Sequence, residues 1–310
     1  MERKLLFIYN PHAGKAQIRS NLLDIIDVFT KAGYTVTARP TQKQGDAKDA
    51  VINRSGDYEL VVCSGGDGTL DEVVTGMMMC QNRIPIGYVP AGTTNDFARS
   101  LKISGNMQRA AADIVNGREY ACDVGIFNDD IFVYIAAFGL FTDVSYETKQ
   151  QVKNVLGHLA YVLEGAKRIS SIPVYHIRAE YEGNVLEGDY MFGMITNSRS
   201  VGGFSKITGR NVDLNDGLFE VTLIKAPYNM VELNLIVTSI LGHKIHSDYM
   251  QTFKASAITV ESSEEIPWTL DGEFGGKHKA VSIRNAFQAL HLVIPDKKKP
   301  PARNGSSDFG

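Results

Sequence analysis

The chain has 310 residues, of which 44% are apolar and 22% are charged, and this composition excludes a largely disordered protein. Its 32 basic and 35 acidic residues give a formal net charge of −3, which disfavours a nucleic-acid-binding protein. The length favours two domains, at roughly 150 residues each. The 3 cysteines are too few for a disulfide framework and fit a reducing, cytoplasmic setting. Because no stretch approaches the ~18 apolar residues of a membrane span, we expect any membrane contact to be peripheral.

The first 120 residues alternate between strand and helix patterns. Short apolar runs predict strands over 5–9, 34–38, 60–63 and 84–89, and helical spacing or polarity predicts helices over 18–29, 46–54 and 70–79. This alternation predicts a doubly wound α/β domain with parallel strands and right-handed crossovers. Ligands of such sheets bind at the carboxyl ends of the strands.

After about residue 120, strand-like runs follow one another with turns between them. They cover 131–138, 175–181, 189–196, 218–224, 257–261 and 280–283, and helical stretches interrupt them near 142–170 and 229–247. We therefore expect a first, α/β domain over residues 1–120 and a larger, β-rich, sandwich-like domain over residues 121–289. The C-terminal segment 290–302 is a candidate to pack on the first domain.

Three glycine loops follow strands of the first domain, over residues 10–15, 64–72 and 90–97. Glycine lets backbone N–H groups approach an anion, and the N-terminus of a following helix adds positive partial charge. A tight turn would explain any one loop, but three at one sheet edge indicate a polyphosphate site. The loops do not follow the usual phosphate motifs. Tyr9 and Ala16 break the Walker A pattern, and Asp71 stands in place of the last glycine of the dinucleotide fingerprint.

Six motifs together carry a family resemblance: Asn10-Pro11, Gly65-Gly66-Asp67-Gly68-Thr69, Gly92-Thr93-Thr94-Asn95-Asp96-Phe97-Ala98-Arg99, Cys122-Asp123-Val124-Gly125, the run 211–218 and Leu270-Asp271-Gly272-Glu273. In this combination they resemble the diacylglycerol kinase catalytic family, and more closely the soluble bacterial diacylglycerol and lipid kinases. That family shares a superfamily with NAD kinase and phosphofructokinase. The resemblance implies an ATP-binding first domain, a lipid-binding second domain, and ATP and Mg²⁺ as cofactors.

The resemblance also implies which residues bind ATP. Carried over position by position, they are Asn10, Pro11, His12, Ala13, Gly14, Thr41, Gly66, Asp67, Gly68, Thr69, Leu70, Asp71, Glu72 and Thr93. From the loops themselves we add Gly65 and Lys15 to this set. Lys15 would add a cationic phosphate donor. From the residues alone, His12 reads as a turn residue beside the first loop.

Acidic residues supply the expected metal ligands, since phosphoryl transfer needs a cation to neutralise charge. The resemblance implies a network of Mg²⁺ and water at Asp67, Asp96 and Asp123. It also implies a structural Mg²⁺ site at Asp213, Asp216 and Leu218. Local alternatives remain open: Asp71 and Asp96 can cap the helices that follow them, and 213–218 can be an ordinary Asn-Asp-Gly turn.

A late acidic motif supplies the expected catalytic base. A carboxylate near the acceptor hydroxyl can take its proton as the phosphoryl group transfers. The family's proton acceptor falls in this motif, and we favour Glu273, with Asp271 as its partner or alternative. The alternative interpretation is an Asp-Gly hairpin turn with solvated acids.

The function these observations favour is an ATP-dependent lipid kinase that phosphorylates the hydroxyl of diacylglycerol to give phosphatidic acid. We expect a cytoplasmic protein in peripheral contact with the membrane, with a lipid substrate and no nucleic-acid partner; a homodimer is left open. Two alternatives remain: a kinase of another alcohol, such as a sphingoid base or NAD, and a nucleotide-binding regulatory protein without turnover.

Overall fold

The computed structural model describes residues 2–14, 16–92, 95–140, 172–198, 212–240 and 248–296. Its strands are β1 (Arg3–Tyr9), β2 (Tyr34–Pro40), β3 (Leu60–Gly65), β4 (Ile86–Pro90), β5 (Arg118–Phe127), β6 (Asp130–Phe132), β7 (Ile135–Gly139), β8 (Tyr175–Tyr181), β9 (Asn184–Thr196), β10 (Phe219–Lys225), β11 (Met250–Ala255), β12 (Ala257–Leu270) and β13 (Glu273–Ile294). Its helices are α1 (Ile18–Lys31), α2 (Asp46–Arg54), a 3-10 turn (Ser55–Asp57), α3 (Asp67–Met79), α4 (Asp96–Leu101), α5 (Met107–Asn116) and α7 (Met230–Ile240). Among these described helices, none is long and apolar enough to cross a membrane.

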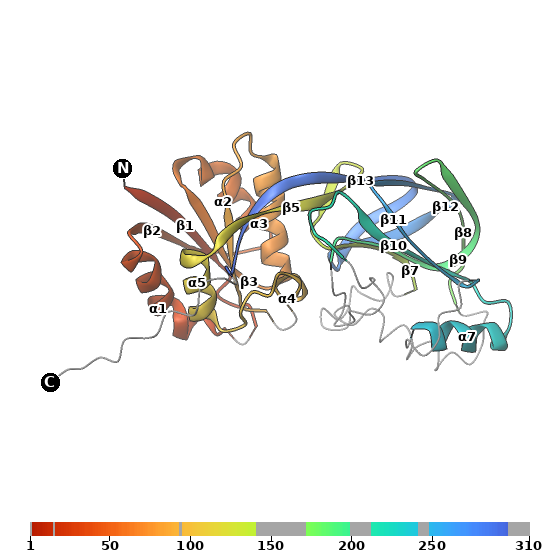
Figure 1. The fold of residues 1–310 in the computed structure, drawn as a ribbon, viewed down its shortest axis with the longest axis horizontal. Coiled ribbons are helices and arrows are strands. Elements are labelled where there is room, and N and C mark those ends of the chain that lie inside the picture. Colours follow the sequence, from red (N-terminus) through yellow and green to blue (C-terminus); the bar gives the residue numbers. More distant parts are fainter. Residues whose placement is uncertain are drawn as a thin grey trace.

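The first half of the chain is a parallel sheet covered by helices on both faces (Figure 1). Its strands lie in the order β2-β1-β3-β4. Alternate residues of β1 point to opposite faces, so Leu5 and Phe7 pack with residues of α1 and α5. Leu6 and Ile8 pack instead with residues of α2 and α3. This arrangement confirms the predicted doubly wound α/β class.

The second half is built from antiparallel strands, as the succession of strand-like runs predicted. β7, β8, β9, β10, β11 and β12 pair with one another. Aromatic rings fill the core between them; Trp268 lies 4.8 Å from Phe138 and 5.1 Å from Phe127, measured between ring centroids. α7 packs through Leu233 and Ile236 against a separate cluster on β7, β9 and β10. The β-rich prediction for this half is therefore confirmed.

Two long strands join the halves (Figure 1). β13 has 22 residues and begins as the partner of β12. It ends parallel to β4, with Leu292 opposite Ile86. β5 runs antiparallel beside β13 for most of this length. The sequence predicted only 280–283 of β13, because most residues of this strand are exposed or half-buried. It missed β5, where Asp123 and Gly125 interrupt the apolar residues.

Two predicted elements differ from the structure in ways that matter for the site. α3 begins at Asp67 and not at Leu70, so its first turn lies inside the second glycine loop. The run 131–138 is not one strand: β6 ends at Phe132 and β7 begins at Ile135. The predicted helical stretch 142–170 lies outside the described residues, as does the end of 229–247. Neither α5 nor β11 was predicted from the sequence pattern.

Candidate active site

The three glycine loops meet at the carboxyl ends of β1, β3 and β4. The N–H group of Asn10 donates to the Ser64 carbonyl at 2.8 Å, and that of Ala91 donates to the Gly65 carbonyl at 2.8 Å. A Cβ added to Gly92 would lie 2.7 Å from the Cα of Gly66, so the second and third loops touch through their backbones. The structure thus brings these loops together as the switch-point argument predicted.

Thr41 joins this edge through the backbone, because its N–H group donates to the Tyr9 carbonyl at 2.9 Å. In the first loop the side chain of Asn10 accepts a hydrogen bond from the His12 N–H at 2.9 Å, which closes a local turn. His12 therefore has the turn position that its residue type suggested. Lys15 and Thr93 lie outside the described residues, and their nucleotide-binding assignment stays a prediction.

The second loop turns directly into α3 with Gly66 at its N-cap. The first-turn N–H groups of a helix have no partner within it, and the helix end carries positive partial charge. A Cβ on Gly65 would lie 2.3 Å from the Thr69 hydroxyl oxygen, so this position needs glycine for the threonine to fold back over it. Leu70 packs in the core, and its N–H donates to the Gly66 carbonyl at 3.2 Å. We infer that the loop offers an anion its first-turn amides rather than Leu70.

Two residues without an assigned role connect the second and third loops. The hydroxyl of Tyr88 donates to the Gly65 carbonyl at 3.1 Å and lies 3.3 Å from the Asn95 side chain. The Asn95 side chain makes two hydrogen bonds with Gly92: it accepts one from the Gly92 N–H at 3.0 Å and donates one to the Gly92 carbonyl at 2.8 Å. The backbone of Asn95 has φ of 51°. Burial and, next, the charge of Asp67 raise the pKa of the Tyr88 hydroxyl well above its ordinary value. Asp67 therefore faces the junction of the two loops.

Glu72 points away from the loop into the first half. Its carboxylate accepts hydrogen bonds from the N–H groups of Gly45 at 2.8 Å and Ala47 at 3.0 Å. Gly45 has φ of 87° and is the N-cap of α2. Glu72 therefore acts as a capping side chain for α2, a contact between two helices that no local sequence pattern indicates.

The late acidic motif is the turn between β12 and β13. Asp271 and Gly272 have φ of 51° and 86°, and Leu270 pairs with Glu273 across the turn. This is the hairpin that an Asp-Gly pair favours. Glu273 is exposed, whereas Asp271 is 8% exposed. The alternative interpretation, a hairpin turn with two solvated acids, therefore applies to Glu273 and not to the buried Asp271.

The Asp271 carboxylate explains the break between β6 and β7. The N–H groups of Tyr134 and Ile135 both donate to its Oδ1 at 2.9 Å, and the N–H of Val133 donates to its Oδ2. Three consecutive amides that bind one carboxylate cannot also bind a neighbouring strand. The Tyr134 hydroxyl adds a hydrogen bond to the Asp271 carbonyl at 3.0 Å. The turn is therefore anchored by β6 and β7.

Asp271 also meets Asp71 of α3, which brings the late motif to the glycine loops. Burial raises the pKa of Asp271 to about 6, against the effect of the three amides. Burial, followed by the charge of Asp271 and a hydrogen bond with it, raises the pKa of Asp71 well above its ordinary value. Asp71 is the fifth residue of α3 and so cannot be its N-cap, which removes the capping alternative for this residue.

Asp123 is fully buried against the loop 212–218. Its carboxylate accepts from the N–H groups of Gly217 and Gln288 at 2.7 Å each and from the Asn285 side chain at 3.3 Å. Its own N–H donates to the Leu214 carbonyl at 2.8 Å. The structure thus joins Asp123 to the predicted structural metal loop. Asp96 begins α4 at the end of the third loop.

The ammonium group of Lys254 lies beside the predicted structural metal loop. Lys254 Nζ lies 2.8 Å from Asp216 Oδ2 and 3.2 Å from Glu220 Oε1. Asp213 accepts a hydrogen bond from the Tyr120 hydroxyl at 3.2 Å. Among the described residues, no three His, Cys, Asp or Glu side chains gather closely enough to hold a metal ion. A metal at Asp216 would therefore have to compete with the Lys254 ammonium group.

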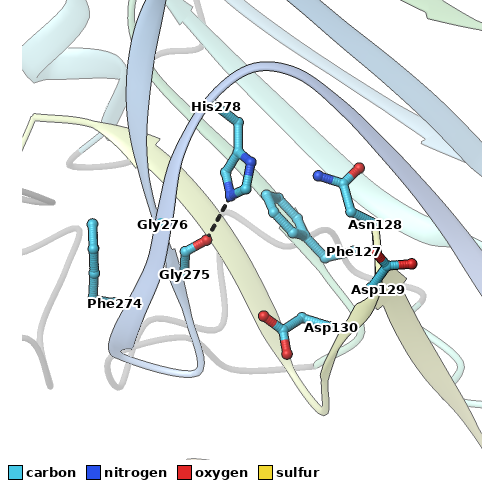
Figure 2. A pocket seen from close by; sticks show the side chains of 8 residues that line it. All are labelled: Phe127, Asn128, Asp129, Asp130, Phe274, Gly275, Gly276 and His278. Atoms are coloured by element: carbon cyan, nitrogen blue, oxygen red, sulfur yellow. Dashed lines mark hydrogen bonds between the residues drawn. The ribbon is translucent and has the colours of Figure 1, made fainter.

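A cavity of about 780 Å³ opens beside the Glu273 turn (Figure 2). It lies between the β5–β6 hairpin and the start of β13, and its lining is Phe127, Asn128, Asp129, Asp130, Phe274, Gly275, Gly276 and His278. His278 Nε2 lies 2.8 Å from the Gly275 carbonyl, and its ring packs edge-on to Phe127. Phe274, the neighbour of Glu273 in the chain, is 50% exposed. No sequence pattern indicated this cavity.

Comparisons with known proteins agree over most of the chain. Residues 4–127 match the diacylglycerol kinase catalytic domain, and residues 137–294 match the YegS C-terminal NAD kinase beta sandwich-like domain. A diacylglycerol kinase of Bacillus subtilis strain 168 is 34% identical over 302 residues, covering 96% of this chain and 98% of its own. A diacylglycerol kinase of Staphylococcus aureus is 35% identical over 299 residues, covering 96% of this chain and 94% of its own.

A solved structure has the same fold. It is described as a candidate diacylglycerol kinase from Bacillus anthracis strain Sterne, with a TM-score of 0.80 and 25% identity. The match covers 96% of both chains.

Proposed function

The chain belongs to the diacylglycerol kinase family and is a lipid kinase, and from this premise we propose that it transfers the γ-phosphoryl group of ATP to the hydroxyl of diacylglycerol, giving phosphatidic acid. The observation that carries the proposal is the contact between α3 and the Asp271 turn. Asp71 of the helix that begins in the second glycine loop lies close enough to Asp271 for the Asp271 charge to raise the Asp71 pKa. This proximity supports a site with the anion-binding loop on one side and the turn that bears the exposed Glu273 on the other.

The glycine loops fit a triphosphate. A Cβ would collide with neighbouring backbone at Gly14 and at Gly92, which leaves a cradle lined by main chain rather than side chains. Amides at the start of α3 would bind phosphate oxygens, with Thr41 beside them. The loops hold the phosphates in line for transfer, and positioning supplies most of the catalysis in such reactions.

We assign a divalent cation to Asp67 and Asp96, as the family resemblance implies. A carboxylate beside phosphates is repelled unless a cation lies between them. Asp67 opens α3 and Asp96 opens α4, so both begin helices at the phosphate edge. Mg²⁺ would neutralise charge on the transferring group.

Glu273 is the residue that we assign as the general base. Asp271 is buried and both of its oxygens accept backbone N–H groups, so this carboxylate is not accessible to an acceptor alcohol. Glu273 is exposed at the start of β13 and stands next to the cavity residue Phe274. Because it is exposed, its carboxylate is free to take the proton of an acceptor alcohol as the phosphoryl group transfers.

The cavity favours an uncharged acceptor over a phosphorylated one. Its eight lining residues include two phenylalanines and two aspartates but neither lysine nor arginine. A diacylglycerol headgroup is neutral and its acyl chains are apolar, whereas NAD carries two phosphates that Asp129 and Asp130 would repel. Because such an acceptor resides in a bilayer, the protein would meet it at the membrane surface.

A lipid panel tests the proposal. The wild-type protein would be assayed with γ-labelled ATP and Mg²⁺ against diacylglycerol, sphingosine, NAD and no acceptor, with the lipids in mixed micelles. We expect label in phosphatidic acid; label in sphingosine phosphate or NADP alone would overturn the assignment of the acceptor. Glu273→Gln should abolish transfer while leaving ATP binding unchanged, and Glu265→Gln, at an exposed site on β12, is the matched control.

A further inference from the structure

The buried hydroxyl group of Tyr88 has partners in two of the glycine loops. Tyr88 lies on β4, opposite Cys63 of β3, and its side chain is 1% exposed. The ring belongs to a core cluster that includes Phe97, where a phenylalanine ring would fill the same space. A buried hydroxyl group costs free energy unless it is hydrogen-bonded, and the partners of this one are Gly65 and Asn95, at 3.1 and 3.3 Å. The oxygen therefore serves the loops and not the packing of the core.

The Gly65 carbonyl oxygen is held from two sides. It accepts hydrogen bonds from the Ala91 N–H at 2.8 Å and from the Tyr88 hydroxyl at 3.1 Å. These two donors occupy both lone pairs of the oxygen and fix the direction of the carbonyl. The peptide between Gly65 and Gly66 is planar and trans, so its N–H points opposite to its C=O. Tyr88 therefore helps to set the direction of the Gly66 N–H, which lies at the N-cap of α3.

The same hydroxyl group meets the third loop at Asn95. Asn95 Oδ1 lies 3.3 Å from the Tyr88 oxygen and accepts the Gly92 N–H at 3.0 Å, while Asn95 Nδ2 donates to the Gly92 carbonyl at 2.8 Å. Gly92 in turn lies against Gly66, because a Cβ on Gly66 would be 3.5 Å from the Gly92 Cα. Glycines have no side chain to restrict their backbone, so these loops depend on such contacts for a fixed shape. Tyr88 supplies these contacts from a strand in the core.

We propose that Tyr88 is a positioning residue for the phosphate-binding loops: its hydroxyl group fixes the Gly65–Gly66 peptide and the Asn95–Gly92 pair relative to each other before the nucleotide binds. This inference rests on the proposed function, which assigns these loops to the phosphates of ATP. Because Tyr88 is buried, it acts through Gly65 and Asn95 and not on the nucleotide itself. A loop that is already ordered loses less conformational entropy on binding, so the contribution of Tyr88 falls on the affinity for ATP.

Tyr88→Phe is the decisive variant, because it removes one oxygen atom and keeps the ring. We expect the Kd of ATP, measured by calorimetry without a lipid acceptor, to rise about 5-fold, as the loss of one hydrogen bond predicts. The KM for diacylglycerol in mixed micelles should stay within ~2-fold of wild type. Tyr190→Phe is the matched control: its side chain is also 1% exposed, and its hydroxyl group donates to Gln251 at 2.8 Å in the second half. This control should change neither value.

Hydrogen exchange gives a second readout, which needs no ligand. The N–H groups of Ala91 and Gly92 donate to the two partners of Tyr88. In Tyr88→Phe both amides should exchange ~5-fold faster or more, whereas the Glu59 amide, hydrogen-bonded just before β3, should exchange at the wild-type rate. The melting temperature should stay within about 2 °C of wild type, because both acceptors of the hydroxyl group keep an N–H donor.

Two results would overturn the proposal. One is a Tyr88→Phe variant that binds ATP within ~2-fold of wild type and exchanges the Ala91 and Gly92 amides at the wild-type rate. The other is a variant with a much lower melting temperature and an equal loss of affinity for ATP and diacylglycerol, which would make Tyr88 a residue of the general core. If the wild-type protein does not bind ATP, the proposed function fails, but amide exchange still tests whether Tyr88 fixes the two loops.

Discussion

Gly14 and Ala91 approach each other so closely that a Cβ on Gly14 would lie 2.2 Å from the Ala91 carbonyl oxygen. Gly14 also has φ of 56°, a conformation that residues with a Cβ adopt at a cost of about 1–2 kcal/mol. The first and third glycine loops can therefore close around a ligand only if this position has no side chain.

Gly14→Ala should separate these two loops. We expect the KM for ATP to rise ~10-fold or more, because amides displaced from the cradle no longer fit the phosphates. Steady-state kinetics with ATP as the varied substrate measures this. Gly33→Ala is the matched control: Gly33 has φ of 87° but nothing within 4 Å of an added Cβ, so it has the backbone strain without the collision. Equal KM values for the two variants would contradict the proposed role of the first loop.

Glu72→Ala should act on stability before it acts on nucleotide binding. The variant leaves the N–H groups of Gly45 and Ala47 without their acceptor, which costs about 1–3 kcal/mol of folding free energy for a buried group. Urea unfolding should show this loss, and Glu265→Ala, at an exposed position, should not. The sequence-based assignment of Glu72 to ATP predicts the opposite: an unchanged unfolding midpoint with weakened ATP binding.

Lys254→Met should make the stability of the protein depend on a metal ion bound at the loop 212–218. Asp216 and Glu220 lose the ammonium group that lies 2.8 and 3.2 Å from their oxygens, and Mg²⁺ can take its place. We expect millimolar Mg²⁺ to raise the melting temperature of the variant more than that of wild type, and EDTA to reverse the difference. Lys279→Met, on an exposed part of β13, controls for loss of a positive charge. Equal responses in all three proteins would mean that Lys254 and the metal do not share a site.

The sequence predicted well that the glycine loops meet at one edge of the sheet, because the signals for these loops are local. Glycines at 65, 66 and 92 follow apolar strands directly, and parallel strands bring such loops to one edge. Even there the start of α3 was misplaced by three residues, since Asp67 and Gly68 are poor helix formers away from a helix terminus.

The rest of the site depends on contacts between distant residues, which a single sequence does not record. The sequence predicted Val133 in the interior of one strand. In the structure its N–H donates to the Asp271 carboxylate instead of to a neighbouring strand. Glu72 stood in a motif associated with phosphate binding, yet its carboxylate caps α2. The pairing of Asp71 with Asp271 joins the two halves of the chain, so neither motif alone could indicate it.

Phe274→Ser tests whether the cavity beside Glu273 receives the acceptor. The ring is half exposed at the cavity wall, and its removal takes apolar surface from an acyl or glycerol group without touching the glycine loops. We expect the KM for diacylglycerol in mixed micelles to rise ~5-fold or more while the KM for ATP stays within ~2-fold, since burying an aromatic side chain contributes on the order of 1–3 kcal/mol. Phe287→Ser is the matched control, because Phe287 is also on β13, is 60% exposed and lies outside the cavity. An equal rise in both variants would indicate a general surface contact with the micelle, and no rise in either would place the acceptor elsewhere.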